Sequence, residues 1–282
     1  KEIGLTGIPS GFTALDRITS GWQKSELIIT AARPAMGKTA FILSMARNAA
    51  VDHGIPIAIF SLEMSAVQLV KRLISGECEL EGEKIKNGTL EEHEWAELNR
   101  KVERLAEAPI YIDDSPAINI FELRAKCRRL VSAYGIKMIY IDYLQLMSGT
   151  SADGRGFSRK QEISHISRSL KSIAKELDMP VIALSQLSRA VESRADKKPQ
   201  LSDLRESGSI EQDADMVLFL FRPDYYGFTT DAEGNSTQGI SEVIIAKHRN
   251  GPTGSVQLRF INKFAKFTDL NPFDDLSEYQ PI

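Results

Sequence analysis

The sequence has no apolar run long enough to cross a membrane, and it has little cysteine. No stretch approaches the roughly 20 apolar residues that a transmembrane helix needs, so we expect no membrane partner. The two cysteines, Cys78 and Cys127, lie far apart without metal-ligand spacing, which argues against a disulfide framework or a cysteine-based metal site. We therefore expect a soluble protein of a reducing compartment, the cytoplasm.

The sequence also has no excess of positive charge, and it contains no internal repeat. The formal net charge of −3 means that any contact with nucleic acid must come from a local patch. The chain of 282 residues, 42% of them hydrophobic, can bury the core of one large domain or two smaller ones. Residues 1–10 include neither an initiator Met nor a signal-like apolar segment, so we expect a fragment of a longer chain.

Short apolar runs, nearly continuous in sequence, predict strands that are covered on both faces, as in a parallel sheet. Helical patterns alternate with them, which predicts an α/β fold with a mainly parallel sheet, flanking helices and right-handed crossovers. Past Ser241, two β-rich runs around a Gly/Pro turn, and a third in 263–270, predict an antiparallel extension at the sheet edge. The predicted parallel strands are Glu26–Ala32, Ile55–Ser61, Ala108–Asp114, Ile136–Asp142, Met179–Ser185 and Asp215–Phe221.

Two helices and the C-terminal end have further signals. Thr89 and Glu92 form a capping-box pattern that opens a charged helix to about Ala106. A stripe of apolar residues at helical spacing runs from Ile163 to Leu177. We expect one domain over residues 1–270, followed by a disordered acidic tail over 271–282.

The segment ITAARPAMGKTAFIL, residues 29–43, nearly matches the phosphate-loop pattern G-x-x-x-x-G-K-[ST], but Ala32 stands where that pattern has its first glycine. The segment follows a strand predicted to be buried and precedes a helix predicted from about Lys38 to Val51. Its backbone N–H groups and the positive end of the helix would therefore face a bound phosphate. Alanine is tolerable if Ala32 can make the turn, because Pro34 fixes the backbone there. The predicted nucleotide-binding residues are Ala32, Arg33, Pro34, Ala35, Met36, Gly37, Lys38, Thr39 and Ala40.

Polar side chains follow three of the predicted strands, where ligands of open α/β sheets gather. Asp142 is placed to hold Mg²⁺ together with Thr39. Glu63, on a strand predicted to lie beside the loop strand, is placed to deprotonate an attacking water, and Gln186 to contact the γ-phosphate. Each alone is also typical of a helix cap or a polar loop residue. Their occurrence together with GKT favours a nucleotide site.

Several segments together resemble the ATPase domain of the bacterial replicative DNA helicase, the DnaB type. The resemblance covers about Gly4 to Leu270 and implies a RecA-like P-loop fold that uses ATP and Mg²⁺. It also implies a homohexameric ring that moves 5′ to 3′ on single-stranded DNA, unwinds duplex at the replication fork, and works with a primase and a helicase loader. That family also has an N-terminal domain and a linker helix, which we expect this fragment to lack. The segments are GIPSGFTALDRITSGW, ARPAMGKTAF, FSLEMS, IDYLQLM, ALSQLSR, SDLRESGSIEQDAD and KHRNGP.

The resemblance also implies roles for three basic residues. Arg72 is similar in position to an arginine that stacks on the nucleotide base, although an exposed arginine is more often solvated or ion-paired. Lys247 and Arg249 look like the pair that reaches the γ-phosphate bound by the neighbouring subunit, with Arg249 as an arginine finger. The alternative, a basic hairpin in water, would leave activity independent of assembly.

The segment SDLRESGSIEQDAD resembles the loop that faces DNA in the central channel. At Arg205, Glu206 and Gly208, backbone N–H groups and the arginine would then bind successive phosphates of one strand without reading bases. A polar loop before a capped helix, Ser209–Asp213, is the alternative. Four basic residues nearby are equally compatible with the channel or with plain solvation: Arg189, Arg194, Lys197 and Lys198.

Two other functions fit parts of this sequence. A recombinase of the RecA type shares the fold but forms open helical filaments. A non-motor protein would use ATP to control its grip on DNA without unwinding it. The segments SLEMS and LRESGSIEQDAD resemble the helicase more closely than either.

Overall fold

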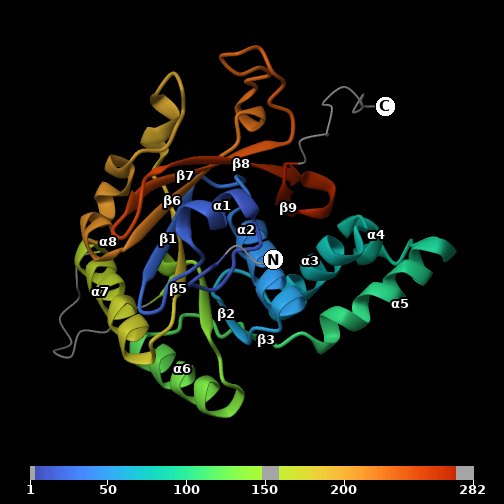
Figure 1. Ribbon diagram of the computed structural model, residues 1–282, viewed down its shortest axis with the longest axis horizontal. Coiled ribbons are helices and arrows are strands. Elements are labelled where there is room, and N and C mark those ends of the chain that lie inside the picture. The colour runs from blue at the N-terminus through green and yellow to red at the C-terminus, as the bar shows by residue number, and fades with distance from the viewer. Residues whose placement is uncertain (1–3, 148–158, 271–282) are drawn as a thin grey trace.

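The computed structural model describes residues 4–147 and 159–270, and for Arg159 and residues 205–208 it describes only the backbone (Figure 1). The predicted acidic tail, 271–282, lies outside the described residues. The strands are β1 Leu27–Ala32, β2 Ile57–Ser61, β3 Ile110–Asp113, β4 Met138–Asp142, β5 Val181–Gln186, β6 Met216–Phe221, β7 Ile240–His248, β8 Gly254–Ile261 and β9 Lys266–Asp269. The α-helices are α1 Thr13–Thr19, α2 Lys38–Arg47, α3 Ala66–Cys78, α4 Gly82–Asn87, α5 Glu92–Glu107, α6 Ile120–Tyr134, α7 Arg159–Leu177 and α8 Gly208–Asp213.

Within the described residues, nine strands form one sheet in the order β3-β2-β4-β5-β1-β6-β7-β8-β9. The pairs from β3 to β6 are parallel and those from β6 to β9 are antiparallel, which confirms the predicted α/β class and its antiparallel extension. The prediction that the strand before Glu63 lies beside β1 is wrong, because β4 and β5 separate β2 from β1. An apolar run predicts that a strand is buried but carries no information on which strand is its neighbour.

Both faces of the sheet are covered, and each has its own core. Every residue of β1 is buried, and alternate side chains enter different clusters. Ile28 packs in the cluster that contains Phe41 of α2, whereas Ile29 packs in the cluster that contains Leu170 of α7. Full burial of one such side chain contributes about 1.5–3 kcal/mol, so the continuous apolar run of β1 is stabilised from both sides.

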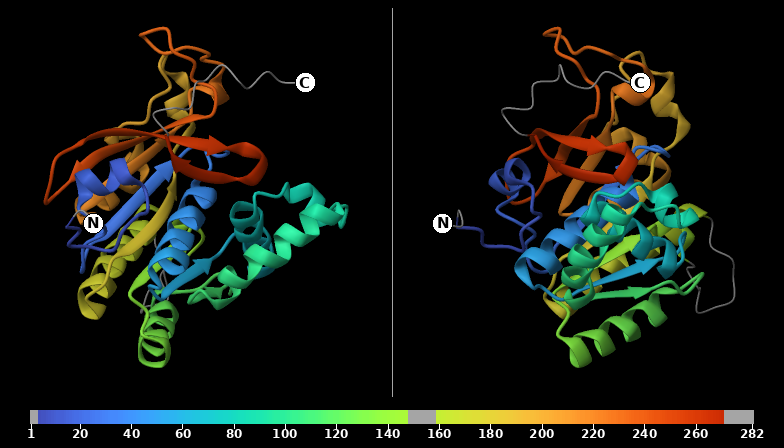
Figure 2. Two further views of the ribbon diagram at one scale, coloured as in Figure 1. Left: turned by 45° about the vertical axis from the view of Figure 1, so that its right-hand side comes forward. Right: turned by 90° about the vertical axis from the view of Figure 1, so that its right-hand side faces the viewer.

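The helices α4 and α5 project away from the sheet (Figures 1 and 2). The predicted capping box of α5 is shifted: Glu91 is the N-cap and its partner is Glu94, whose carboxylate accepts a hydrogen bond from Glu91 N–H at 2.9 Å. Thr89 lies two residues before this N-cap, and its N–H donates to the carbonyl of Lys84 at 3.1 Å, at the end of α4.

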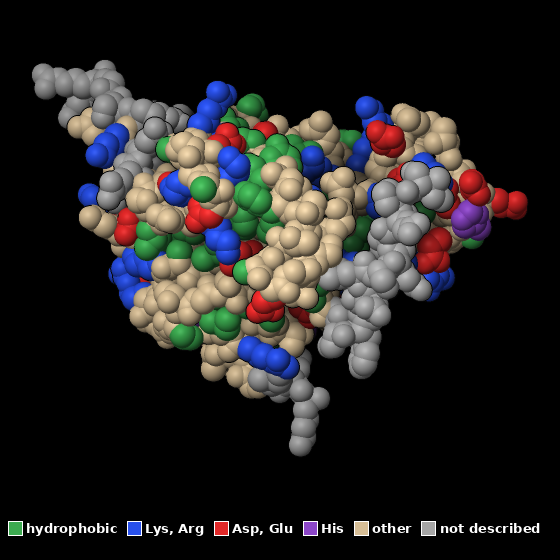
Figure 3. Space-filling model, turned by 90° about the horizontal axis from the view of Figure 1, so that it is seen from above, with side chains coloured by type: hydrophobic (Ala, Val, Ile, Leu, Met, Phe, Trp, Pro, Cys, Tyr) green, Lys and Arg blue, Asp and Glu red, His purple; other side chains and the backbone are tan. Residues whose placement is uncertain are grey.

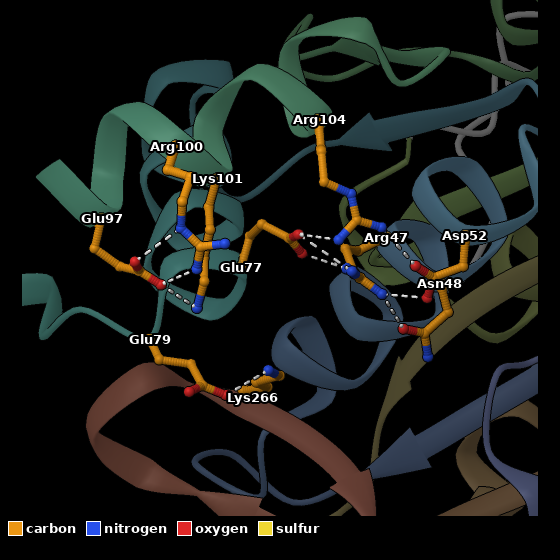
Figure 4. Close-up of polar contacts among 10 residues, drawn as sticks. All are labelled: Arg47, Asn48, Asp52, Glu77, Glu79, Glu97, Arg100, Lys101, Arg104 and Lys266. Carbon is orange, nitrogen blue, oxygen red and sulfur yellow. Dashed lines mark hydrogen bonds and ion pairs between the residues drawn. The ribbon is translucent and has the colours of Figure 1, made fainter.

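Ion pairs tie the end of α2 to the neighbouring helices (Figure 4). Arg47 of α2 binds the carboxylates of Glu77 of α3 and Asp52, and Arg104 of α5 approaches the same two carboxylates. A helical segment, Asn48–Asp52, continues α2 close to the predicted end at Val51. The helix that begins at the phosphate loop is therefore anchored at its other end. None of the described helices is both long enough and apolar enough to cross a bilayer.

Candidate active site

The loop between β1 and α2 takes a turn for which the first glycine of the general pattern is unnecessary. Ala32 remains within β1, buried and in register with Gln186 of β5. The left-handed positions fall later, at Ala35 (φ 65°) and Gly37 (φ 90°), and Gly37 is the N-cap of α2. Because Ala32 makes no turn, an alanine costs nothing there. L side chains rarely adopt the backbone conformation of Gly37, and a Cβ there would also lie 3.1 Å from the Phe267 ring, so glycine is favoured at that position.

Other side chains of the predicted loop point into the protein. Arg33 is buried and pairs with Glu192 at 2.9 Å, and it also donates to the carbonyl of Leu187 at 2.8 Å. The side chains of Met36 and Ala40 are in the core, whereas Pro34 and Ala35 are exposed. The loop therefore has backbone groups and Lys38, rather than these side chains, to offer a phosphate.

Lys38 lies at the start of α2, folded back over the loop. Its Nζ donates to the carbonyls of Ala32 at 3.3 Å and Arg33 at 3.4 Å. Burial lowers the pKa of Lys38, while the charges of Asp142 and Glu63 oppose that shift. The ends of β4 and β2 thus place both predicted carboxylates close enough to act on this ammonium group.

Thr39 and Asp142 are joined directly, as expected for residues that share one cation. Thr39 Oγ1 donates to Asp142 Oδ2 at 2.7 Å, and the other carboxylate oxygen, Oδ1, is buried without a hydrogen-bond partner. Burial raises the pKa of Asp142, the Thr39 hydrogen bond lowers it, and the charge of Glu63 raises it further. The described residues contain no cluster of three or more His, Cys, Asp or Glu side chains suited to a metal. These two residues fit Mg²⁺, which takes most of its ligands from water and phosphate.

Gln186 is the last residue of β5 and is exposed next to the end of β1. Its backbone is fixed by Gln145, whose Nε2 donates to Ser185 Oγ at 2.8 Å and to the Gln186 carbonyl at 3.3 Å. The sequence patterns assign no role to Gln145, and its place three residues after Asp142 is the signal that could have identified it.

Arg72 is exposed on α3, and its positive charge lowers the pKa of Asp142, although burial has the larger, opposite effect. It borders a cleft that is also lined by Ser44 of α2 and by Lys266 and Phe267 of β9. This cleft adjoins the helix that follows the phosphate loop, which is compatible with the predicted contact to a base.

Lys247 and Arg249 lie at the other end of the sheet. β7 runs antiparallel to β6, so His248 pairs with Met216, the first residue of β6, whereas the phosphate loop follows the last residue of β1. Strands of six residues are about 20 Å long. Neither side chain can therefore reach the phosphate loop of its own chain.

A β-bulge directs both of these side chains. Val217 pairs with Lys247 but Leu218 pairs with Ile245, which leaves Ala246 as an extra residue. Lys247 Nζ consequently donates to the carbonyls of Glu211 and Ala214, both at 2.6 Å, at the end of α8. Burial, followed by the charge of Arg249, lowers the pKa of Lys247.

The side chains of the predicted DNA-binding residues, Arg205, Glu206 and Gly208, lie outside what the structure describes. Their backbone runs from a 3₁₀ segment, Leu201–Ser207, into α8. Of the nearby basic residues, Arg194 pairs with Asp203 at 2.5 Å and Lys198 with Glu242 at 2.8 Å. On the face shown in Figure 3, Lys and Arg are interspersed with Asp and Glu, so no broad basic area covers the described residues there.

Comparison with known proteins gives consistent matches over nearly the whole chain. The family model described as "DnaB-like helicase C terminal domain" matches residues 7–269. The Replicative DNA helicase DnaB of Geobacillus stearothermophilus is 52% identical over 277 residues, which are 98% of this chain and 60% of that protein. The chain thus spans less than two thirds of that relative.

Solved structures agree with this match. A DnaB-like replicative helicase, described with its interactions with primase, superposes with a TM-score of 0.88 and 43% identity, covering 95% of this chain and 63% of that one. A separately solved ATPase domain has the same TM-score and identity, covering 96% of this chain and 94% of that one. The RadB recombinase, at 16% identity and a TM-score of 0.54 over 94% of this chain and all of the other, shows the fold alone. The predicted RecA-like fold class is confirmed.

Proposed function

This chain belongs to the DnaB-like helicase C-terminal domain family, and on that premise we propose that it is the ATP-driven motor domain of a replicative DNA helicase. Six copies form a ring, hydrolyse ATP between adjacent copies, move along single-stranded DNA and unwind duplex at the replication fork. Residues 1–270 form the motor, and an N-terminal domain with a linker helix belongs to the whole protein. Its expected location is the cytoplasm, at the nucleoid.

The position of Arg249 carries this proposal. The phosphate loop lies at one end of the parallel strands and Arg249 at the other, beyond reach of its own loop. A nucleotide that needs both must lie between two copies of the chain. Repeated head-to-tail contact of this kind closes into a ring when the rotation permits, and an arginine supplied in trans stabilises charge on the transferred phosphoryl group.

The residues at the phosphate-loop end of the sheet have separate roles in ATP binding and hydrolysis. Lys38 exchanges its bonds to the carbonyls of Ala32 and Arg33 for bonds to the outer phosphates. Thr39 and Asp142 hold Mg²⁺, which supplies charge neutralisation at the phosphates. Glu63 accepts the proton of the attacking water, and Gln186 contacts the γ-phosphate.

The remaining contacts follow from the resemblance. Arg72 stacks on the base. Backbone N–H groups at Arg205, Glu206 and Gly208, with the Arg205 guanidinium, bind the phosphates of single-stranded DNA, so the affinity for DNA falls as salt rises, whatever the base sequence. One of the similar helicases was solved with attention to its interactions with primase, and we propose a primase and a helicase loader as partners of this protein.

The test uses mixed subunits of the full-length protein. Arg249→Ala should lower the ATPase rate about 10³-fold or more, and Glu63→Ala should do so independently. An equimolar mixture should regain activity. Where the two variants meet, the Glu63→Ala subunit can supply an intact Arg249 to an Arg249→Ala subunit, which has an intact Glu63. The ATPase rate per subunit should also rise with protein concentration and with single-stranded DNA.

Two results would contradict the proposed function. A rate that is flat with concentration, together with a silent Arg249→Ala, would mean that each chain hydrolyses ATP alone, and a non-motor role would then be preferred. Helical filaments in place of closed rings would favour a recombinase.

A further inference from the structure

A buried carboxylate lies directly behind Arg249. Asp215, the residue before β6, has a side chain that is only 5% exposed, whereas that of Arg249 is 50% exposed. Asp215 Oδ1 accepts a hydrogen bond from Arg249 at 3.0 Å. Oδ2 accepts from the backbone N–H of Leu27 at 2.8 Å and from Lys171 Nζ at 2.5 Å. The carboxylate therefore binds two cations and one amide.

The second cation, Lys171, changes the net charge of the group that contains Arg249 and Asp215. A lone Asp–Arg pair is neutral and would attract a phosphate weakly. Lys171 of α7 is 16% exposed and is fixed by a further hydrogen bond to the carbonyl of Ser25 at 2.8 Å. Because Lys171 balances the charge of Asp215, the guanidinium can be held by a carboxylate while the group of three keeps a net positive charge. A buried carboxylate without such balance would be strongly destabilising.

Backbone contacts complete the restraint on Arg249. Its own N–H donates to the carbonyl of Asp215 at 2.8 Å, and its guanidinium also donates to the carbonyl of Gln212 at 3.3 Å. After the bulge at Ala246, the side chains of Lys247 and Arg249 both donate to backbone carbonyls of α8. The base of Arg249 is fixed, while half of its side chain remains accessible.

We propose that Asp215 is a positioning residue for the ATPase reaction: it fixes the guanidinium of Arg249 for the neighbouring subunit's nucleotide, with Lys171 as the balancing charge. This inference rests on the proposed function. Asp215 itself touches no nucleotide, since it lies behind Arg249 and is buried. Its effect on catalysis passes through the geometry of Arg249 alone.

The test is Asp215→Asn in the assembled full-length protein. Asparagine keeps the shape and an acceptor for Leu27 but loses the charge, so kcat should fall about 10- to 100-fold, the cost of a misplaced catalytic group. KM for ATP should stay within about twofold of wild type, because the positioned guanidinium acts on charge that develops in the transition state rather than on bound ATP. Asp178→Asn, at an exposed pair with Lys24, is the matched control and should leave kcat unchanged.

Two further variants separate positioning from folding. Lys171→Met with Asp215→Asn removes both buried charges together, so this protein should remain folded and still show the low kcat. In an Arg249→Ala background, Asp215→Asn should change kcat by less than about twofold, because both act through one group.

Each contrary result has one meaning. If Arg249→Ala lowers the ATPase rate but Asp215→Asn does not, or if the two effects multiply, the positioning role is overturned and the proposed function stands. If Arg249→Ala itself is silent, the proposed function is overturned, and this inference with it.

Discussion

The two ends of the central strands carry opposite imbalances of charge. At the end of β1, Lys38 faces two carboxylates, Glu63 and Asp142, and one oxygen of Asp142 is buried without a partner. At the start of β6, Asp215 faces two cations, Lys171 and Arg249. Within these contacts, carboxylates outnumber the cation around Lys38, and cations outnumber the carboxylate around Asp215.

Under the proposed function, one copy would be an incomplete enzyme. A sheet whose strands are about 20 Å long keeps the two ends apart, so neither imbalance can correct the other within one chain. Between copies, the nucleotide and its metal ion would meet both. Single substitutions can test whether the phosphate-loop end and the Arg249 end of the strands have separate functions.

The largest effect is expected from Glu63→Gln. Loss of a general base costs about 10²- to 10⁴-fold in rate, so single-turnover hydrolysis should fall about 10³-fold while ATP still binds. Arg249 of the same subunit should still act on the nucleotide bound by the neighbouring subunit. Glu97→Gln on α5 is the control, because that carboxylate pairs with Arg100 and Lys101 of its own helix. A fall of less than tenfold would remove Glu63 from the role of base.

Asp142→Asn should change activity and stability in opposite directions. Hydrolysis should fall about 10²-fold or more, since Asp142 would help to hold the Mg²⁺ that would stabilise negative charge on the phosphates. The pKa of Asp142 is raised, chiefly by burial, so its ionised form opposes folding above the ordinary value of 3.8. The neutral amide removes this cost, and Tm of the nucleotide-free protein should rise. A lower Tm measured by calorimetry would contradict this account of the site.

Glu77→Gln tests the anchor of α2, away from the phosphate loop and from Arg249 but at the cleft that Arg72 borders. Burial raises the pKa of Glu77, but hydrogen bonds and charge from Arg47, then the charges of Arg104 and Lys266, outweigh it and lower the pKa below 4.5. The carboxylate therefore stabilises the fold above pH 4.5, and this stabilisation is lost as pH falls through the lowered value. Loss of charged hydrogen bonds should cost about 2 kcal/mol at pH 7.

The measurement for Glu77→Gln is urea unfolding at several pH values. The difference from wild type should shrink as the solution is acidified from neutral pH. A difference that is constant with pH would mean that the ionised carboxylate is not the stabilising species. Glu79→Gln, at an exposed pair with Lys266, is the matched control and should change stability by less than about 0.5 kcal/mol.

The smallest effect is expected from Gly37→Ala at the phosphate loop. Gly37 has φ 90° and a Cβ would meet the Phe267 ring at 3.1 Å, so unfolding free energy should fall by about 1–2 kcal/mol. Ala35→Gly, at φ 65°, relieves a similar strain and should be nearly neutral or stabilising. Equal destabilisation by both changes would show that the left-handed backbone is not what requires glycine at position 37.

Sequence patterns predict polar residues that follow apolar strand runs, and these residues meet because the carboxyl ends of parallel strands lie at one edge of the sheet. Thr39 and Asp142 are predicted as one metal pair, and they are hydrogen-bonded at 2.7 Å. The same patterns place the strand before Glu63 beside β1, which is wrong, and give no role to Asp215 or Gln145. These errors share a cause: strand order and contacts between distant residues are set by packing of the whole sheet.

By itself, the sequence determined which segments form strands and which turn is the candidate phosphate loop, because apolar runs and a Gly-Lys-Thr turn act over a few residues. Tertiary structure decided the rest. Antiparallel pairing of β7 with β6 placed Arg249 at the end of the sheet away from its own loop, and the bulge at Ala246 set the direction of Lys247. Pairing joins residues 34 positions apart, Asp215 and Arg249, and no local pattern encodes a contact whose energy exists only after the sheet has formed.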